Sequence, residues 1–427
     1  MDWSSTRAPG ATGPMAAGGG PAAPEAGPAA AELVSAFSLA IDLAEGRQFN
    51  HARRTAGIAV GLWEALGLPE EGRGDVFYAG LLHDAGAINL LWPLAHLKPD
   101  SSSERELIRQ HPLKSAEIAR TLRFTGRAAE IITGHHEFWD GSGYPLGRCG
   151  EENPLESRIL CLADRLDVAY GSGAARDFPA LLEYARRHAG TLFDPQLVDA
   201  FARMADRAFE FAGATGRPSD EAVPGRHLEK LVPAQGTSVD EVVRALAGLI
   251  DAKSPYTAAH STNVARLSWM VGERFGLSGD RLEKIRTAGW LHDIGKVAIP
   301  GAIIDKPGKL DLDEMNLMRR HSLYSGQILE QINAFVPEVA PWARSHHERL
   351  DGTGYPSGLG AADLPLEARI LSAADMFDAL TSDRSYRKGM PTEEALDVMW
   401  RCCEGTFGRE VFEAVRECAP RFLADRQ

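Results

Sequence analysis

The chain has 427 residues, enough for two ordinary domains, and its 44% apolar and 25% charged residues are typical of a globular protein. A formal net charge of −13 argues against a general nucleic-acid binder, and no apolar run is long enough to predict a membrane span. The five cysteines are odd in number and form no C-x-x-C pair, which predicts reduced thiols and a cytoplasmic location.

Composition and periodicity divide the chain into four segments. Residues 1–31 are mostly Ala, Gly and Pro and are expected to be a disordered leader. Residues 32–211 carry apolar residues at helical spacing, whereas residues 212–236 are rich in Gly and Pro and are expected to be a linker. The helical pattern then returns over residues 237–427, first as SVDEVVRALAGLIDAK. Strand-like alternation is scarce, so both long segments are predicted to be all-α.

The two helical segments repeat one histidine frame. His51 and His83 in the first are as far apart as His260 and His292 in the second. A double histidine follows in each segment, within HHEFWDGSGYP and HHERLDGTGYP, and each precedes an aspartate at the same distance. Ten of the 13 histidines belong to this frame, so the chain is interpreted as a tandem duplication.

The repeated frame indicates a metal site. A lone histidine is most often a structural residue, but five histidines and two aspartates at matched spacing favour metal binding. Imidazole and carboxylate ligands together suit Fe, Mn, Zn or Co ions, and the lack of thiolate ligands argues against a structural zinc site. Consecutive residues on a helix point about 100° apart, so His346 and His347 fit two adjacent ions better than one, and Asp293 could bridge them. Two such ions suit phosphate-ester hydrolysis without a serine or cysteine nucleophile.

Longer motifs stand in a fixed order in the second segment. They are HSTNVARLS (260–268), LHDIGKVAIP (291–300), KPGKLDLDE (306–314), RRHSLYSGQIL (319–329), HHERLDGTGYP (346–356) and RILSAADMFDALTSDRSYR (369–387). This series, over about residues 237–400, resembles the HD-GYP family of HD-superfamily phosphohydrolases. The resemblance implies an all-α HD-domain bundle, here in two tandem copies, with an iron or manganese centre. It also implies hydrolysis of cyclic di-GMP to linear pGpG or GMP, and some members prefer cyclic GMP-AMP.

The resemblance also implies roles for individual residues. The predicted metal ligands are His260, His292, Asp293, His321, His346, His347 and Asp375. Asp293 and Lys296 are the predicted catalytic residues, because Lys296 lies one helical turn on and can reach a phosphate or the leaving oxygen. Tyr355 is expected to stack on or hydrogen-bond the nucleotide. Arg384 and Arg387 resemble the family's basic substrate contacts, and the alternative for them is a solvated surface pair.

One position departs from the family pattern. Members with a third metal carry a glutamate one turn before the first histidine, and Tyr256 stands there in this chain. The expected cofactor is therefore two divalent ions, Fe or Mn, in the C-terminal domain. Hydrolysis that stops at the linear dinucleotide is favoured over full conversion to GMP.

The first segment keeps the ligand pattern and changes other parts. The matching positions are His51, His83, Asp84, His111, His135, His136 and Asp164, which predict a second metal site. Tyr144 keeps the Gly-Tyr-Pro tyrosine, but Ala87 replaces the lysine and nothing matches SDRSYR. Three hypotheses stay open for this copy. It is a metal-holding regulatory or dimerising domain, an enzyme for another phosphoester, or a structural relic without metal.

The leading prediction is a metal-dependent cyclic di-GMP phosphodiesterase that acts at the second repeat, with the first repeat regulatory. The alternatives are a cyclic-nucleotide receptor or docking module without turnover, and an HD phosphohydrolase of another nucleotide. Lys296 beside a full ligand set favours the enzyme, because a receptor needs no general acid. Cyclic di-GMP and GGDEF-type diguanylate cyclase domains are the expected partners, without nucleic acid or membrane, and a homodimer is left open.

Overall fold

The computed structural model describes most of both helical segments. The described residues are 34–39, 41–42, 50–89, 102–122, 125–204, 239–251, 259–330, 337–383 and 387–425. The predicted leader (1–31) and linker (212–236) lie outside these residues, as do Tyr256 and Arg384, so the predictions made for them stay predictions.

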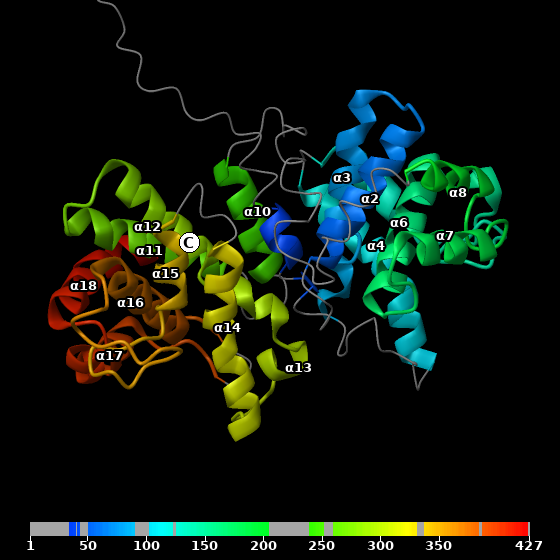
Figure 1. The fold of residues 1–427 in the computed structure, drawn as a ribbon. Helices are drawn as coiled ribbons and strands as arrows, with labels where there is room; N and C mark the ends of the chain where they lie inside the picture. Colours follow the sequence, from blue (N-terminus) through cyan, green and yellow to red (C-terminus); the bar gives the residue numbers. More distant parts are fainter. Residues whose placement is uncertain are drawn as a thin grey trace, which may run out of the picture.

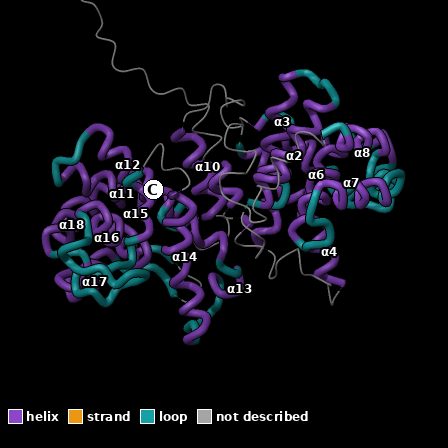
Figure 2. Tube along the Cα trace, viewed as in Figure 1, coloured by secondary structure: helices purple, strands orange, loops and turns teal. Residues whose placement is uncertain are grey.

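Helices joined by loops make up the described part of the chain, which confirms the predicted all-α class (Figure 2). No strand occurs among the described residues, and strand-like pairing is limited there to two isolated bridges, Ala189 with Phe193 and Asp351 with Gly360. None of the helices in the described ranges has both the length and the apolar composition needed to cross a membrane.

The first repeat forms one group of helices (Figure 1). Helical residues at 34–39 and 41–42 precede α2 (His51–Ala65), η1 (Glu70–Gly72), α3 (Arg73–Leu82), η2 (Ala85–Asn89), α4 (Ser102–Thr121), α5 (Ala128–Thr133), η5 (Gly150–Glu152), α6 (Leu155–Gly171), α7 (Phe178–Arg187) and α8 (Pro195–Ala202). Helix α2 packs against α3, α6 and α8, and α4 packs against η2 and α5.

The second repeat forms a corresponding group (Figure 1). Its elements are α10 (Val239–Asp251), α11 (His260–Arg274), α12 (Gly279–Leu291), η7 (Ile294–Ala298), α13 (Gly301–Ile304), α14 (Leu312–Glu330), α15 (Val339–Arg344), α16 (Leu366–Thr381), α17 (Thr392–Thr406) and α18 (Arg409–Ala424). Helix α11 packs against α12, α16 and α18, and α14 packs against η7 and α15, as their counterparts do in the first repeat.

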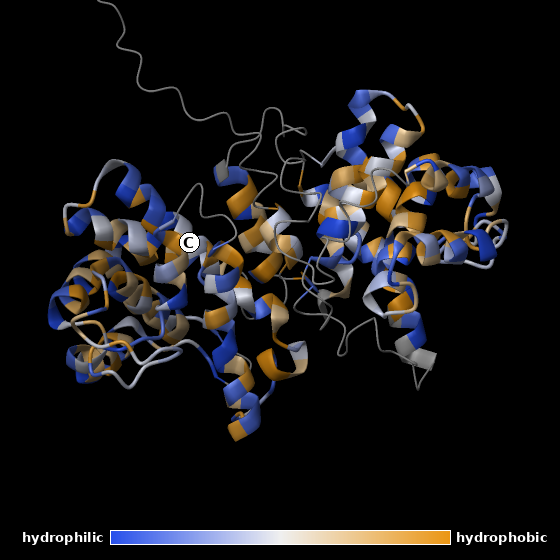
Figure 3. Ribbon diagram, in the orientation of Figure 1, coloured by the Kyte–Doolittle hydropathy of each residue, from blue (hydrophilic) through white to orange (hydrophobic). Residues whose placement is uncertain are grey.

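Apolar helix faces meet in the interior of each repeat (Figure 3). Phe37 and Phe193 are the largest fully buried side chains of the first repeat, and Phe377, Phe407 and Phe422 are those of the second. Removing such a side chain from water contributes about 1.5–3 kcal/mol. Most of the buried apolar residues of both repeats belong to one contiguous cluster.

An aspartate on the preceding helix fixes the start of each helix that begins with a histidine. Asp251, the last residue of α10, accepts hydrogen bonds from the Ser261 N–H at 3.1 Å and the Ser261 hydroxyl at 2.7 Å. Asp42 accepts the Ala52 N–H at 3.3 Å in the first repeat. These carboxylates satisfy donors that a helix start leaves without a partner, so His260 and His51 are held as first helical residues.

Two glycines determine how closely the histidine-bearing helices cross. A Cβ on Gly289 of α12 would lie 2.3 Å from Cα of Ala265 in α11. A Cβ on Gly80 of α3 would likewise lie 2.5 Å from Cα of Ala56 in α2. Backbone atoms inside packed helices cannot move aside, so only glycine permits this approach. The crossing brings the ring of His292, at the end of α12, next to the start of α11.

Replacement of Gly289 by alanine is therefore expected to destabilise the protein by about 1–3 kcal/mol, even though alanine favours helix formation. The matched control is Gly248→Ala in α10, where a Cβ meets nothing within 4 Å. This control is expected to be neutral or to stabilise by up to about 1 kcal/mol. Urea unfolding followed by circular dichroism measures both, and a Gly289→Ala protein as stable as the wild type would contradict the close-crossing argument.

Candidate metal centres

The second repeat brings together all seven of its predicted ligands. They are His260 at the start of α11, His292 and Asp293 after α12, His321 within α14, His346 and His347 after α15, and Asp375 within α16. Their ligand atoms form three overlapping groups, each with all atoms within 4.8 Å of one another: His260 with His292 and Asp375, His292 with Asp293 and His346, and His321 with His346 and His347.

Asp293 lies between these groups. Its Oδ2 is 3.5 Å from Nε2 of His260 and 3.2 Å from Nε2 of His292. Its Oδ1 is 3.4 Å from Nε2 of His321 and 3.9 Å from Nε2 of His346. One carboxylate thus presents a different oxygen to each set of imidazoles, which is the arrangement that a bridging ligand between two cations requires.

Backbone carbonyls one helical turn earlier orient three of the imidazoles. Nδ1 donates to Gly289 O at 2.8 Å in His292, to Met318 O at 2.6 Å in His321, and to Ala343 O at 2.5 Å in His346. A proton on Nδ1 leaves the Nε2 lone pair directed into the cluster. Nε2 of His260, Nε2 of His292 and Oδ1 of Asp293 are buried and make no hydrogen bond, so the donor set fits divalent cations.

Asp378 orients His260, and the sequence motifs did not single it out. Its Oδ2 accepts the Nδ1 proton of His260 at 2.7 Å, and its Oδ1 accepts from Nδ2 of Asn263 at 3.0 Å. The signal that could have found it is its spacing, because Asp378 follows Asp375 by three residues on α16 and shares its helix face. A carboxylate behind an imidazole makes the other ring nitrogen a stronger metal ligand.

The Asp378→Asn substitution is expected to lower the affinity for Mn²⁺ about 10- to 100-fold, because the polarising charge behind His260 is lost. Competition against a chelator on the metal-free protein measures this affinity. Asp383→Asn is the control, since that carboxylate is exposed and pairs with Lys388 instead of a histidine. Equal Mn²⁺ affinity in the wild type and the Asp378→Asn protein would contradict a supporting role.

Gly295 allows the segment after Asp293 to lie against α14. A Cβ at this position would be 2.0 Å from the carbonyl oxygen of His321, and the Gly295 N–H donates to Oγ of Ser325 at 2.9 Å. A larger residue would push α14 and its histidine away from the aspartate. Gly86 makes the same close approach in the first repeat.

Burial and charge oppose one another at the carboxylates. Burial alone would raise the pKa of Asp293, but the electrostatic interactions with His292 and with the Lys296 ammonium outweigh it and hold this pKa well below its usual value. Burial lowers the pKa of His321 to about 3 and that of His347 to about 4. At neutral pH Asp293 is therefore ionised and His321 and His347 are neutral, which are the protonation states in which these three residues bind a metal.

Lys296 extends over the cluster from η7. Its Nζ donates to Oδ2 of Asp293 at 2.5 Å, and its side chain is 19% exposed. The ammonium therefore combines a fixed position on the central carboxylate with access from solvent. A phosphate oxygen that approached the cluster could meet this cation.

The Gly-Tyr-Pro turn holds Tyr355 against the cluster. The ring centroids of Tyr355 and His347 are 4.8 Å apart, and the Arg319 guanidinium lies 5.4 Å from the tyrosine centroid. The carboxylate of Glu348 holds the chain just after the turn by accepting the backbone N–H groups of Ser357 at 2.6 Å and Leu359 at 3.0 Å. The sequence motifs did not assign a role to Glu348, although it directly follows the double histidine and is buried.

Arg387 donates to the backbone at the end of α16. Its Nη1 donates to Leu380 O at 3.0 Å and its Nη2 to Ala379 O at 2.5 Å. Carbonyl groups in the last turn of a helix lack partners within it, so the guanidinium secures the end of the helix that carries Asp375. The substrate contact predicted for Arg387 stays a prediction, and Arg384 lies outside the described residues.

The first repeat reproduces the cluster. Its ligands are His51 at the start of α2, His83 and Asp84 after α3, His111 within α4, His135 and His136 after α5, and Asp164 within α6. Asp84 Oδ2 lies 3.1 Å from Nε2 of His83, and Asp84 Oδ1 lies 3.3 Å from Nε2 of His111. The corresponding distances in the second repeat are 3.2 and 3.4 Å. The full ligand set predicted for the first repeat is thus also brought together.

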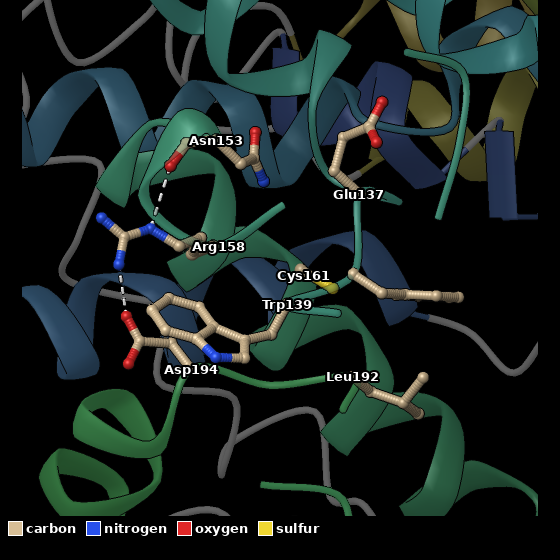
Figure 4. A pocket seen from close by; sticks show the side chains of 9 residues that line it. Glu137, Trp139, Asn153, Arg158, Cys161, Leu192 and Asp194 are labelled. Carbon is tan, nitrogen blue, oxygen red and sulfur yellow. Dashed lines mark hydrogen bonds and ion pairs between the residues drawn. The ribbon is translucent and has the colours of Figure 1, made fainter. Parts of the chain in front are cut away.

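The first repeat differs around this cluster. Ala87, at the position of Lys296, is buried and carries no charge. A small pocket of about 10 Å³ beside the Gly-Tyr-Pro loop is lined by Glu137, Phe138, Trp139, Gly150, Asn153, Arg158, Cys161, Leu192 and Asp194 (Figure 4). Arg158 is held there by Asp194 and by the carbonyl of Asn153, so this group fixes the pocket wall.

Paired HD-type clusters in two helical bundles define the class of the protein. The family model described as HD domain matches residues 36–197 and 244–411, one match for each repeat. The chain belongs to the HD-GYP family of HD-domain phosphohydrolases and is a phosphodiesterase of that metal-dependent family.

Individual relatives match the chain to different extents. The 3'3'-cGAMP-specific phosphodiesterase 3 of Vibrio cholerae is 32% identical over 91% of this chain and 94% of its own. RpfG of Xanthomonas campestris pv. campestris, a cyclic di-GMP phosphodiesterase response regulator, is 39% identical over 43% of this chain and 50% of its own. The crystal structure of a cyclic GMP-AMP specific phosphodiesterase of V. cholerae, V-cGAP3, matches with a TM-score of 0.64 at 30% identity, over 91% of this chain and 97% of that chain.

Proposed function

We propose that the chain hydrolyses a 3',3'-linked cyclic dinucleotide at the metal centre of the second repeat. The observation that carries this proposal is the 2.5 Å contact between Lys296 Nζ and Asp293 Oδ2 within a complete ligand cluster. The first repeat has the same cluster without this cation, because Ala87 stands there. Diester hydrolysis develops charge on the leaving oxygen, so a fixed ammonium at one cluster points to chemistry at that cluster.

The seven ligands would hold two divalent ions, Fe or Mn. His260, His292 and Asp375 would hold one, His321, His346 and His347 the other, and Asp293 both. When bound, the ions supply an activated water and Lewis-acid stabilisation of the phosphate. Lys296 is placed to bind a phosphate oxygen and to give a proton to the leaving oxygen. Tyr355, with Arg319 beside it, offers an aromatic face on which a purine can stack.

The preferred substrate is proposed to be 3'3'-cyclic GMP-AMP. Two relatives that match across both repeats, over 91% and 84% of this chain, are named as specific for that nucleotide. The relatives named for cyclic di-GMP, such as RpfG, match less than half of this chain. Cyclic di-GMP, which the sequence motifs predicted, is therefore the second candidate. Both substrates present a 3',5'-phosphodiester to the same metal and lysine geometry.

Turnover by the full chain tests the function and the substrate preference together. Metal-free protein is loaded with Mn²⁺ or Fe²⁺ without oxygen, and each cyclic dinucleotide is followed by chromatography. Linear products are expected with both metals, with a higher kcat/KM for 3'3'-cyclic GMP-AMP. Faster turnover of cyclic di-GMP would reverse the preference. Tight binding without products in the metal-loaded protein would overturn the enzyme and leave a receptor.

The first repeat is proposed to be regulatory. The matched ligand distances support metal binding, and the missing cation argues against efficient diester hydrolysis there. An enzyme for another phosphoester remains the alternative. Cyclase domains and a second copy of the chain stay predicted partners.

A further inference from the structure

The side chain of Arg165 places a positive charge beside the cluster of the first repeat, at a position where the second repeat has an uncharged residue. Arg165 follows Asp164 on α6, and the corresponding residue beside Asp375 on α16 is Met376. Its Nη2 lies 3.1 Å from Nδ1 of His136, and its Nε lies 3.8 Å from Oδ2 of Asp164. The guanidinium also lies 5.7 Å from the centroid of the Phe138 ring, which holds it in place at the cluster.

The contact with His136 has a consequence for its imidazole. A guanidinium has only donors, so Nδ1 of His136 must accept, and it does so with a lone pair. A neutral imidazole has one such lone pair in the ring plane, and its other nitrogen then carries the proton. His136 therefore cannot both accept from Arg165 and ligate a cation as a neutral ring. At the corresponding place in the second repeat, the side chain of Met376 has no N–H or O–H group, so it cannot donate to His347.

We propose that Arg165 withdraws His136 from metal binding, so that the first repeat holds one of its divalent ions more weakly than the second repeat does. The affected group is Asp84, His111, His135 and His136, whose ligand atoms lie within 4.8 Å of one another. The positive charge of Arg165 also repels a cation in this group. This proposal rests on metal binding by the repeats and does not depend on turnover.

A second substitution acts in the same direction. Arg54 donates to both oxygens of Asp167, at 2.6 and 3.0 Å, and Asp167 also accepts the Nδ1 proton of His51 at 2.6 Å. The neutral Asn263 takes the place of Arg54 in the second repeat. An arginine shares the charge of the carboxylate and leaves less of it to polarise the histidine. In the first repeat, Arg165 thus acts on the ligand group that contains His136, and Arg54 acts through Asp167 on the group that contains His51.

Titration of the metal-free full chain with Mn²⁺ tests the proposal, with free Mn²⁺ followed by its electron paramagnetic resonance signal. The wild type is expected to bind one Mn²⁺ about 10- to 100-fold more weakly than its tight ions. Arg165→Met is expected to raise the affinity for this Mn²⁺ to that of the tightly bound ions. Arg165→Lys, which keeps a donor, is expected to leave it weak. Met376→Arg is expected to weaken one of the tight ions of the second repeat.

A binding curve for Arg165→Met that equals the wild-type curve, or is weaker, would overturn the proposal. If Arg165→Met does not fold, as judged by circular dichroism, Met376→Arg decides by itself. An unchanged curve for a folded Met376→Arg protein is then the negative result. Because the readout is bound Mn²⁺, failure of the proposed catalytic activity leaves this test unaffected.

Discussion

Asp293→Asn is expected to lower turnover of the cyclic dinucleotide by about 10³-fold, because two divalent ions would lose their shared anionic ligand. The two oxygens of this carboxylate face different imidazole groups, at 3.2 Å for His292 and 3.4 Å for His321. An amide keeps the shape but removes the charge, and its NH₂ can only donate toward one of the groups. Loss of about 4 kcal/mol of stabilisation by the metals corresponds to this factor. Product chromatography and metal analysis on the same sample measure turnover and ion content.

The first repeat contains the matched control. Asp84→Asn makes the same change in a cluster with nearly the same distances, and is expected to leave kcat within about threefold if turnover belongs to the second repeat. A change in KM or in the response to added nucleotide would support the regulatory role proposed for the first repeat. The opposite pattern, with activity lost in Asp84→Asn and kept in Asp293→Asn, would reverse the assignment of the two repeats.

Lys296→Ala is expected to reduce kcat by about 10²- to 10⁴-fold, which is the range for a positioned general acid or charge stabiliser. The ammonium lies on the edge of the cluster that solvent reaches, with a side chain 19% exposed. The substitution leaves all seven ligands in place, so bound metal is expected to stay near the wild-type amount. Single-turnover kinetics with metal analysis separates a loss of chemistry from a loss of ions.

Lys284→Ala provides the comparison for this second substitution. Lys284 lies on α12, the helix that leads into the same cluster, but its ammonium pairs with Asp280 and Glu338. Its removal is expected to leave kcat unchanged. Full activity in Lys296→Ala, together with loss of activity in His83→Ala, would place the reaction in the first repeat.

The sequence was sufficient to predict the helical class and the two groups of imidazoles and carboxylates that lie close together. The reason is that these side chains must lie at fixed positions on packed helices, so the number of residues between them is nearly the same in both repeats and can be recognised in the sequence. His260, for example, meets His292 because the first lies at a helix start and the second at the end of the helix packed against it. The proximity of residues whose position in a helix is fixed could therefore be predicted from their spacing in the sequence.

Contacts that depend on side-chain direction could not be predicted in the same way. Asp378 was available from its three-residue spacing, but whether it faced His260 depended on how α16 packs on α11. Arg387 was expected at the substrate, and its reach to the carbonyls of α16 follows from the path of the chain after that helix. Alignment of the two repeats shows that Arg165 corresponds to Met376, but only the side-chain conformation of Arg165 shows that its guanidinium contacts His136.

The two copies differ in length at two places without losing the match between their clusters. The second is one residue longer between Asp293 and His321 than the first is between Asp84 and His111, and one residue longer again before the double histidine. Ligand distances nevertheless agree to about 0.1 Å at these histidines. The differences in length are thus taken up between the ligands, and the relative positions of the imidazoles are nearly the same in both copies. The packed helices, and not the length of the connections between them, thus set where the ligands lie, so one added residue in a connection leaves the distances between ligand atoms unchanged.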